Sequence, residues 1–158
     1  MVTLEEVTMI RAPIERCFDL SRSIELHTRS TERTGEVAIA GVTAGLIGLG
    51  EEVTWRARHF GITQKTTVRI TAFDLPKYFQ DRMVRGAFRF FEHDHWFVER
   101  GDVTDMRDVL RFAAPLGILG LSVEPVLRGY LRRLLRTRNL VIREVAEEDG
   151  WINYLPAS

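Results

Sequence analysis

Two histidines and one aspartate are the combination of side chains in this sequence best suited to chemistry. His93 and His95 are two residues apart, so on a β-strand both rings point to the same face. Asp108 lies in the segment that would pair with that strand in a hairpin, among apolar neighbours. If the two faces coincide, the Asp108 carboxylate lies within reach of a histidine. His59 shares a face with Trp55 on another segment and could join the same group.

Three kinds of site fit this group, and the spacing alone leaves them open. A His-X-His pair on a strand is a workable chelate for a metal ion. The same histidines could move protons, with Asp108 fixing the tautomer of one ring. In the third interpretation, the polar side chains satisfy one another on the wall of a partly hydrated pocket. We expect this third arrangement, with no metal and no cofactor; if catalysis occurs, His93, His95 and Asp108 are the candidates.

Aromatic and other apolar side chains surround these polar residues along the chain, and most of them must form the core. Some are expected to face open space beside the histidines. The residues expected to line a ligand cavity are Trp55, His59, Met83, Phe91, His93, His95, Phe97, Met106, Asp108, Phe112, Leu127, Leu131 and Leu134. Nucleophilic catalysis has no support, because the chain has no Gly-X-Ser-X-Gly motif and its single cysteine, Cys17, sits in an apolar context.

The composition sets limits on the class of protein. A length of 158 residues suits one domain, residues 1–158, with residues 149–158 as a C-terminal tail. Lys+Arg and Asp+Glu both total 22, so overall charge gives no support for a nucleic-acid partner. One cysteine excludes an intramolecular disulfide. The first residues do not resemble a signal peptide, and we expect no transmembrane segment and a cytoplasmic location.

Hydrophobic periodicity predicts the elements that must position the candidate residues. Strands are expected over 3–11, 36–40, 52–59, 63–73, 78–85, 88–100 and 104–113, with short helices over 14–21 and 24–29. Gly101 and Asp102 form the turn between the last two strands. Residues 40–50 contain four glycines and no charge, which predicts either a closely packed connection or a mobile flap.

A long helix is predicted over 122–148, after the helix-breaking Pro115 and Gly117. Its apolar side chains recur every three or four residues and form one stripe. They are Val123, Leu127, Tyr130, Leu131, Leu134, Val141 and Val145. We assign its many arginines, Arg138 among them, to the other faces, where they form a local basic surface.

The order of elements predicts an α+β, two-layer architecture. Short turns imply antiparallel pairing, because parallel crossovers need a dozen or more residues. About seven strands would form a twisted, curved sheet around the long C-terminal helix. A curved sheet that grips one helix leaves room between the two layers, which is the usual place for a small-molecule site.

The sequence also resembles the helix-grip fold of the START-like superfamily, the SRPBCC group of polyketide cyclase/dehydrase and lipid-transport-like proteins. The likeness covers about residues 3–148 and is closest to a bacterial branch of that group. It rests on Gly48 to Gly61 (GLGEEVTWRARHFG), Gly86-Ala87-Phe88, His93-Asp94-His95, Asp108 and Ala114-Pro115-Leu116-Gly117. The resemblance implies a cavity for a hydrophobic ligand, and it does not name the ligand.

Three hypotheses of function follow. In the first, the protein binds a hydrophobic or amphipathic small molecule, such as a lipid or polyketide, between the sheet and the C-terminal helix. In the second, it is a cyclase or dehydratase that uses His93, His95 and Asp108 in acid–base chemistry. In the third, the arginine-rich helix face or the apolar tail docks a partner protein. The tail, with Trp151 and Tyr154, would pack either on its own domain or on a second copy in a homo-oligomer.

Overall fold

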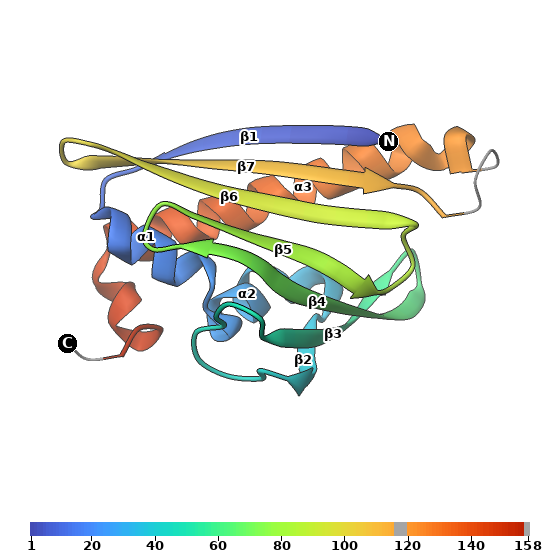
Figure 1. Cartoon of the computed structure of the whole chain (residues 1–158), viewed down its shortest axis with the longest axis horizontal. Coiled ribbons are helices and arrows are strands. Elements are labelled where there is room, and N and C mark those ends of the chain that lie inside the picture. The colour runs from blue at the N-terminus through green and yellow to red at the C-terminus, as the bar shows by residue number, and fades with distance from the viewer. Residues whose placement is uncertain (116–119, 157–158) are drawn as a thin grey trace.

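Seven strands form one sheet in which every neighbouring pair is antiparallel, as the computed structural model of residues 1–115 and 120–156 shows (Figure 1). The order across the sheet is β1-β7-β6-β5-β4-β3-β2, so the first strand of the chain pairs with the last. The predicted α+β architecture is therefore confirmed. The strands are β1 (Val2–Ile10), β2 (Val37–Gly41), β3 (Glu52–His59), β4 (Ile62–Asp74), β5 (Tyr78–Arg85), β6 (Phe90–Arg100) and β7 (Val103–Ala113).

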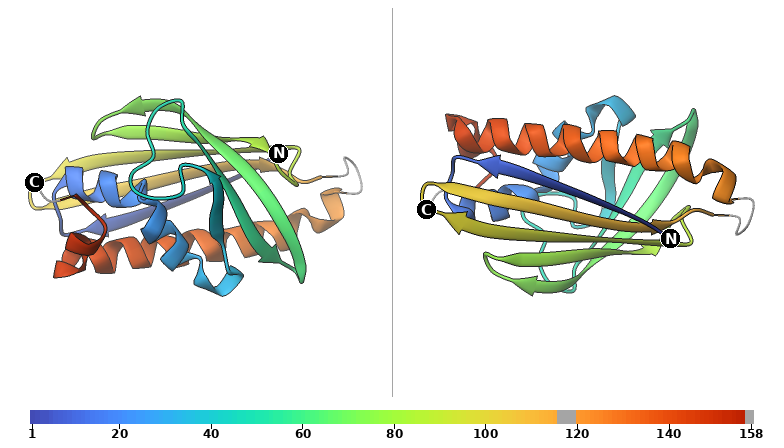
Figure 2. Two further views of the ribbon diagram at one scale, coloured as in Figure 1. Left: turned by 90° about the horizontal axis from the view of Figure 1, so that it is seen from below. Right: turned by 90° about the horizontal axis from the view of Figure 1, so that it is seen from above.

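The long helix α3 (Gly120–Glu147) lies against the curved sheet, and Figure 2 shows the two short helices between its C-terminal half and the strands. These are α1 (Ile14–Ser21) and α2 (Ile24–Ser30), and both contact α3. A single turn of 3₁₀-helix, η1 (Glu32–Thr34), leads into β2, and a second, η3 (Asp149–Asn153), follows α3. The helix begins two residues earlier than predicted. Leu116 and Gly117, and the side chain of Ser122, lie outside the part of the chain that the structure describes.

The main core forms where α1 packs onto the sheet. Phe18 of α1 is fully buried, and its ring contacts those of Phe73, Phe79 and Phe97 edge-on at centroid distances of 5.2, 5.4 and 5.4 Å. Edge-to-face pairs at such distances add to the stabilisation from burial. As a result, α1 fills this end of the space beneath the sheet, and the open space lies further along α3.

The glycine-rich segment 40–50 is anchored to the domain at Ile47 and Gly45, while most of its other residues are exposed. Its Ile47 is buried in the core and donates its backbone N–H to the Arg22 carbonyl at 3.2 Å. The Gly45 carbonyl accepts from the Ile24 N–H at 3.0 Å, which ties the segment to the start of α2. Gly41 cannot be replaced without strain, because its φ is +73° and an added Cβ would lie 2.2 Å from the Glu52 carbonyl oxygen.

The apolar tail packs on its own domain. Trp151, Tyr154 and Leu155 contact the main core, and the Arg16 guanidinium lies 4.2 Å from the centre of the Trp151 ring. Arg29 donates a hydrogen bond of 3.0 Å to the Tyr154 hydroxyl. The intramolecular packing expected for the tail is thus present over residues 149–156.

Candidate functional site

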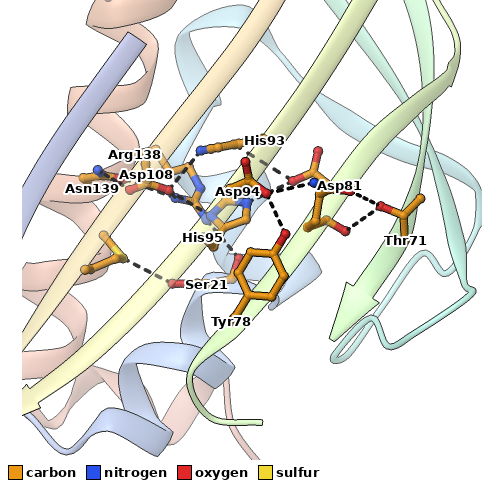
Figure 3. Close-up of polar contacts among 12 residues, drawn as sticks. Ser21, Thr71, Tyr78, Asp81, His93, Asp94, His95, Asp108, Arg138 and Asn139 are labelled. Atoms are coloured by element: carbon orange, nitrogen blue, oxygen red, sulfur yellow. Dashed lines mark hydrogen bonds and ion pairs between the residues drawn. The ribbon is translucent and has the colours of Figure 1, made fainter. Parts of the chain in front are cut away.

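The histidine pair lies at the centre of a buried polar cluster, drawn in Figure 3. His95 contacts two carboxylates: its Nδ1 lies 2.8 Å from Asp108 Oδ1, and its Nε2 lies 2.9 Å from Asp81 Oδ2. His93 lies beside it, with 3.8 Å between the ring centres and the ring planes inclined at 43°. His93 Nε2 lies 3.0 Å from Asp108 Oδ1. The prediction that Asp108 lies within reach of a histidine is confirmed.

Strand register brings these side chains together. His95 of β6 faces Asp108 of β7, and His93 faces Asp81 of β5. Residues directly opposite each other on neighbouring strands have their Cβ atoms about 5 Å apart, which is within the reach of an imidazole and a carboxylate. The hairpin pairing of β6 with β7 was predictable. Asp81 was missed because its register depends on the 78–85 strand, whose partner was not assigned from the sequence.

Two side chains of α3 complete the cluster, and the sequence analysis missed both. Asn139 donates a hydrogen bond of 2.7 Å from Nδ2 to Asp108 Oδ2. Arg138 lies 3.5 Å from Asp108 Oδ1 and donates to the Ser21 carbonyl at 3.0 Å. The assignment of Arg138 to an exposed face is wrong, since only 8% of it is exposed. The signal was its spacing: it lies four residues after Leu134 and three before Val141, on the apolar stripe itself.

The charges of the cluster balance. Burial alone would raise the pKa of Asp108, but His93, His95 and Arg138 outweigh it and hold that pKa well below its ordinary range. The pKa of Asp81 is lowered against burial by the same two histidines. Burial alone would lower the pKa of His95, but its hydrogen bonds to Asp108 and Asp81 raise it. Two carboxylates and two cations, His95 and Arg138, therefore form a neutral group.

His93 is the uncharged member of the cluster. Burial lowers the pKa of His93, and the charge of the neighbouring His95 lowers it further. The neutral His93 ring is therefore favoured. Its Nε2 is buried and makes no hydrogen bond of good geometry to the residues that the structure describes, although Asp108 is close. Its Nδ1 lies 3.9 Å from Asp81 Oδ2, which is too far for a hydrogen bond. His93 is thus the member of the cluster with bonding capacity to spare.

A cavity of about 220 Å³ opens beside the cluster, between the sheet and the helices. Asp81, His93, His95 and Arg138 form part of its wall. Most of the remaining wall is apolar, and it comes mainly from β3, β4, β5, β6, β7, α2 and α3. These apolar wall residues include Val53, Trp55, Val68, Ile70, Phe91, Leu110, Leu131, Leu134 and Leu135.

Seven of the residues named from the sequence lie on this wall: Trp55, His59, Phe91, His93, His95, Leu131 and Leu134. The other six do not. Phe97 and Met106 are covered by α1, which fills that end of the sheet with Phe18 and with a hydrogen bond from Ser21 to Met106 Sδ. Phe112 is buried against Phe88 and Leu4 in a second small core. Asp108 lies behind the histidines and is fully buried. Met83 is half-buried off the wall, and Leu127 lines a smaller neighbouring pocket.

His59 lies on the wall but does not join the histidine–aspartate cluster. Its Nδ1 lies 2.7 Å from the hydroxyl of Tyr130 on α3. The grouping of His59 with His93 and His95, which the sequence left open, does not occur in the structure. The reason is the strand order, because β4 and β5 lie between β3 and β6.

Within residues 1–115 and 120–156, one set of side chains meets the distance requirement for a metal site. The donor atoms of Asp81, His93 and His95 lie within 4.8 Å of one another. However, both nitrogens of His95 already contact carboxylates, and the cluster is neutral without a cation. The hydrogen-bonded ion network accounts for the arrangement, so we assign no metal to it.

The opposed pKa shifts of the two histidines predict how stability depends on pH. Below the ordinary histidine pKa of 6.5 the unfolded chain protonates His93, whereas the folded protein resists it, so this residue lowers stability as the pH falls. His95 does the opposite: its contribution is complete below 6.5 and is lost as the pH rises through its raised folded pKa. Asp81, His95, Asp108 and Arg138 are the charged groups that face His93.

We expect His93→Gln to reduce the loss of stability between pH 6.5 and 5, because glutamine cannot bind the proton that the fold resists. Urea unfolding of both proteins at pH 5, 6 and 7 measures this difference. Parallel pH profiles for the two proteins would contradict the assignment of a neutral His93.

The arrangement of elements defines the fold. A curved seven-stranded antiparallel sheet around a long C-terminal helix, with two short helices after the first strand, is the START-like helix-grip fold. In the residues described, no helix is long and apolar enough to cross a bilayer. No family profile matches the sequence, and no curated protein is significantly similar to it in sequence.

Solved structures share this fold. The Zhui aromatase/cyclase from Streptomyces sp. R1128 superimposes with a TM-score of 0.75 at 11% identity, over 92% of this chain and 93% of its own. A START superfamily protein from Mycobacterium smegmatis matches with a TM-score of 0.68 at 13% identity, over 90% and 98% of the two chains. Major latex-like protein 151 from Panax ginseng gives 0.65 at 14%, over 93% and 98%. Identities this low establish a shared fold and leave the activity to be argued from the site.

Proposed function

We propose that this protein binds a compact amphipathic small molecule in the cavity between its sheet and α3. The observation that carries the proposal is a largely apolar wall interrupted by a buried histidine, His93, whose Nδ1 lies 3.9 Å from Asp81 Oδ2, too far for a hydrogen bond. A cavity built of apolar walls with a few convergent polar groups is typical of small-molecule sites. The helix-grip fold, shared with the structures named above, is compatible with this role.

The size of the cavity limits the ligand. At about 220 Å³ it is larger than the ~150 Å³ engineered cavity that accommodates benzene, and smaller than the ~300–1,000 Å³ of drug-sized sites. A molecule of one or two rings fits this volume. A longer lipid or polyketide would place only a segment of its length inside.

The chemistry of His93 indicates the polar group of the ligand. With its Nε2 beside the ionised Asp108, the proton of the neutral ring is placed on Nε2, because a carboxylate accepts and cannot donate. The Nδ1 lone pair is then an acceptor. A ligand hydroxyl that donates to Nδ1 would satisfy it, while the rings of the ligand pack on the apolar wall.

Acid–base catalysis on the bound molecule is the second candidate. His93 is a neutral imidazole with Asp108 behind it and the positively charged His95 beside it. In such a step, the Nδ1 lone pair of His93 would take a proton from a carbon next to a ketone, leaving an enolate, and would return it afterwards. The aromatase/cyclase named above shares the fold at 11% identity, which leaves its chemistry a hypothesis for this chain.

Two measurements separate the two candidates. The bicyclic phenol 2-naphthol, whose hydroxyl can donate to His93 Nδ1, should bind saturably in calorimetry with a dissociation constant in the micromolar to millimolar range, which is ordinary for a ligand of this size. With the bicyclic ketone 2-tetralone in deuterated buffer, proton NMR follows exchange at the carbons beside the ketone. A binder leaves exchange at the buffer rate, whereas a catalyst accelerates it, and His93→Gln abolishes the acceleration. Absence of saturable binding would rule out both candidates for this class of ligand.

A further inference from the structure

A second polar cluster lines the same cavity on the β2 and β3 side. Glu36, His27 and His59 all form part of the wall, together with Trp55. The His27 ring packs against Trp55 at a centroid distance of 4.3 Å and an interplanar angle of 32°, and its Nε2 lies 3.5 Å from Glu36 Oε2. That Nε2 is buried without a hydrogen-bond partner in the part of the chain that the structure describes. The polar atoms here are therefore incompletely satisfied.

The protonation states give this cluster a definite bonding character. Burial alone would raise the pKa of Glu36, but the neighbouring His27 outweighs it, so the pKa is lowered and the carboxylate is ionised. Burial lowers the pKa of His59, and burial raises the pKa of Tyr130, so both are neutral. Tyr130 can then donate its hydroxyl proton to His59 Nδ1, which leaves an N–H on the other side of the His59 ring. The cluster thus offers the cavity an anionic acceptor and a ring donor.

The two polar clusters lie at opposite sides of the cavity. Trp55 and His59 are on β3, whereas His93 and His95 are on β6, three strand spacings away. At ~4.8 Å per spacing the backbones are about 14 Å apart along the sheet. The side chains point into the concave face, which shortens the gap between their polar atoms. Apolar residues of the intervening strand β4, Val68 and Ile70, form the wall between the clusters.

We propose that Glu36, with His27 and His59, forms a second polar subsite, and that the ligand carries a hydroxyl group at each of two opposite ends. This inference rests on the proposed function and extends it from one polar contact to two. A hydroxyl suits the subsite because it donates to the Glu36 carboxylate and accepts from a ring N–H of a histidine at the same time. Two fused rings with a hydroxyl at each end form a rigid molecule that can present one hydroxyl to each cluster across the apolar wall.

The test compares three probes that differ by one hydroxyl each: naphthalene, 2-naphthol and 2,6-dihydroxynaphthalene. In the wild-type protein we expect the second hydroxyl to strengthen binding about tenfold or more, the usual range for a hydrogen bond to a charged group. Glu36→Gln should abolish this gain while leaving the affinity for 2-naphthol within about threefold, because the His93 end still binds one hydroxyl. His93→Gln should abolish the same gain from the opposite end. Fluorescence titration of the probes gives all the constants.

Glu32→Gln is the matched control, because Glu32 is exposed on η1 and is not part of the cavity wall. It should keep the full gain from the second hydroxyl. If Glu36→Gln also keeps the gain, or if the wild-type protein shows none, the second subsite is wrong while the proposed function stands. If 2-naphthol itself does not bind the wild-type protein, the proposed function fails first. Circular dichroism of each variant identifies any that does not fold. If Glu36→Gln does not fold, Tyr130→Phe replaces it, because this change removes only the hydroxyl that orients His59. Tyr130→Phe should likewise lose the increase in affinity that the second hydroxyl gives the wild-type protein.

Discussion

Replacement of Asp108 by alanine is expected to lower the free energy of unfolding by about 3–5 kcal/mol, the largest single effect at this site. Asp108 is fully buried and is the shared acceptor of the network, with Asn139 and His95 at hydrogen-bond distance and Arg138 at 3.5 Å. Removal of the carboxylate leaves the charge of Arg138 or of His95 unbalanced in a buried place. Their desolvation penalty remains, and the attraction that offset it is lost.

Urea denaturation at pH 7 measures this effect, and two further variants interpret it. Asp105→Ala, on the same strand, removes a carboxylate that pairs with the exposed Arg100 at 2.6 Å, and it should cost less than about 1 kcal/mol. The double variant Asp108→Ala/Arg138→Met should lose less than the sum of the two single variants, because it removes a negative and a positive charge together. A loss below about 1 kcal/mol for Asp108→Ala would show that the network is not held together by this carboxylate.

Local patterns were sufficient to predict the elements of this fold. Each strand and helix follows from alternation or from three-to-four spacing, and the short turns require antiparallel neighbours. The meeting of His95 with Asp108 was predictable for the same reason, because Gly101 and Asp102 form a hairpin turn that sets their register. Contacts between strands that follow each other in the sequence can thus be predicted from sequence patterns.

Contacts between distant segments were harder to predict, and they account for the errors. Phe97 and Met106 occupy the correct face of the sheet, yet α1 covers them, and nothing local to β6 or β7 indicates where α1 will pack. Asp81 depends on the register of β5 against β6, and the connection 86–89 between these strands does not fix that register from the sequence as the Gly101-Asp102 turn fixes β6 against β7. Glu36 and His27 meet only because η1 and Gly35 turn the chain back toward α2.

Arg138 illustrates a different kind of error, in which residue type was given more weight than position. Its spacing places it on the apolar stripe of α3, and arginine is almost never fully buried unless it is paired. A charged residue on such a stripe therefore predicts a buried partner of opposite charge. Asp108, a single acid among apolar residues of β7, was the complementary signal. Arg138 and Asp108 are the two exceptions to the hydrophobic pattern, and each is the buried, oppositely charged partner of the other. Arg138 Nη1 lies 3.5 Å from Asp108 Oδ1.

The role of the cavity itself is tested by filling it, and Val68→Trp is expected to weaken binding of 2-naphthol by about 100-fold or more, or ~2.8 kcal/mol. Val68 lies on β4 in the middle of the cavity wall, between the two polar clusters. A side chain at this position of the strand points into the concave face, so the added indole must occupy the space of the ligand. Because the space already exists, we expect the cost in stability to stay within the ~1–3 kcal/mol of an overpacked core.

Thr63→Trp is the control for Val68→Trp, since Thr63 lies on the same strand, is exposed and is not part of the cavity wall. It adds the same aromatic surface outside the cavity, so the affinity for 2-naphthol should remain within about twofold of wild type. Thermal denaturation checks that both variants still unfold cooperatively. If Val68→Trp folds and binds 2-naphthol as tightly as Thr63→Trp does, the ligand occupies another surface, because an indole and a naphthol cannot share a cavity of about 220 Å³. Loss of binding in Val68→Trp alone would locate the ligand between the sheet and α3, with both polar clusters within its reach.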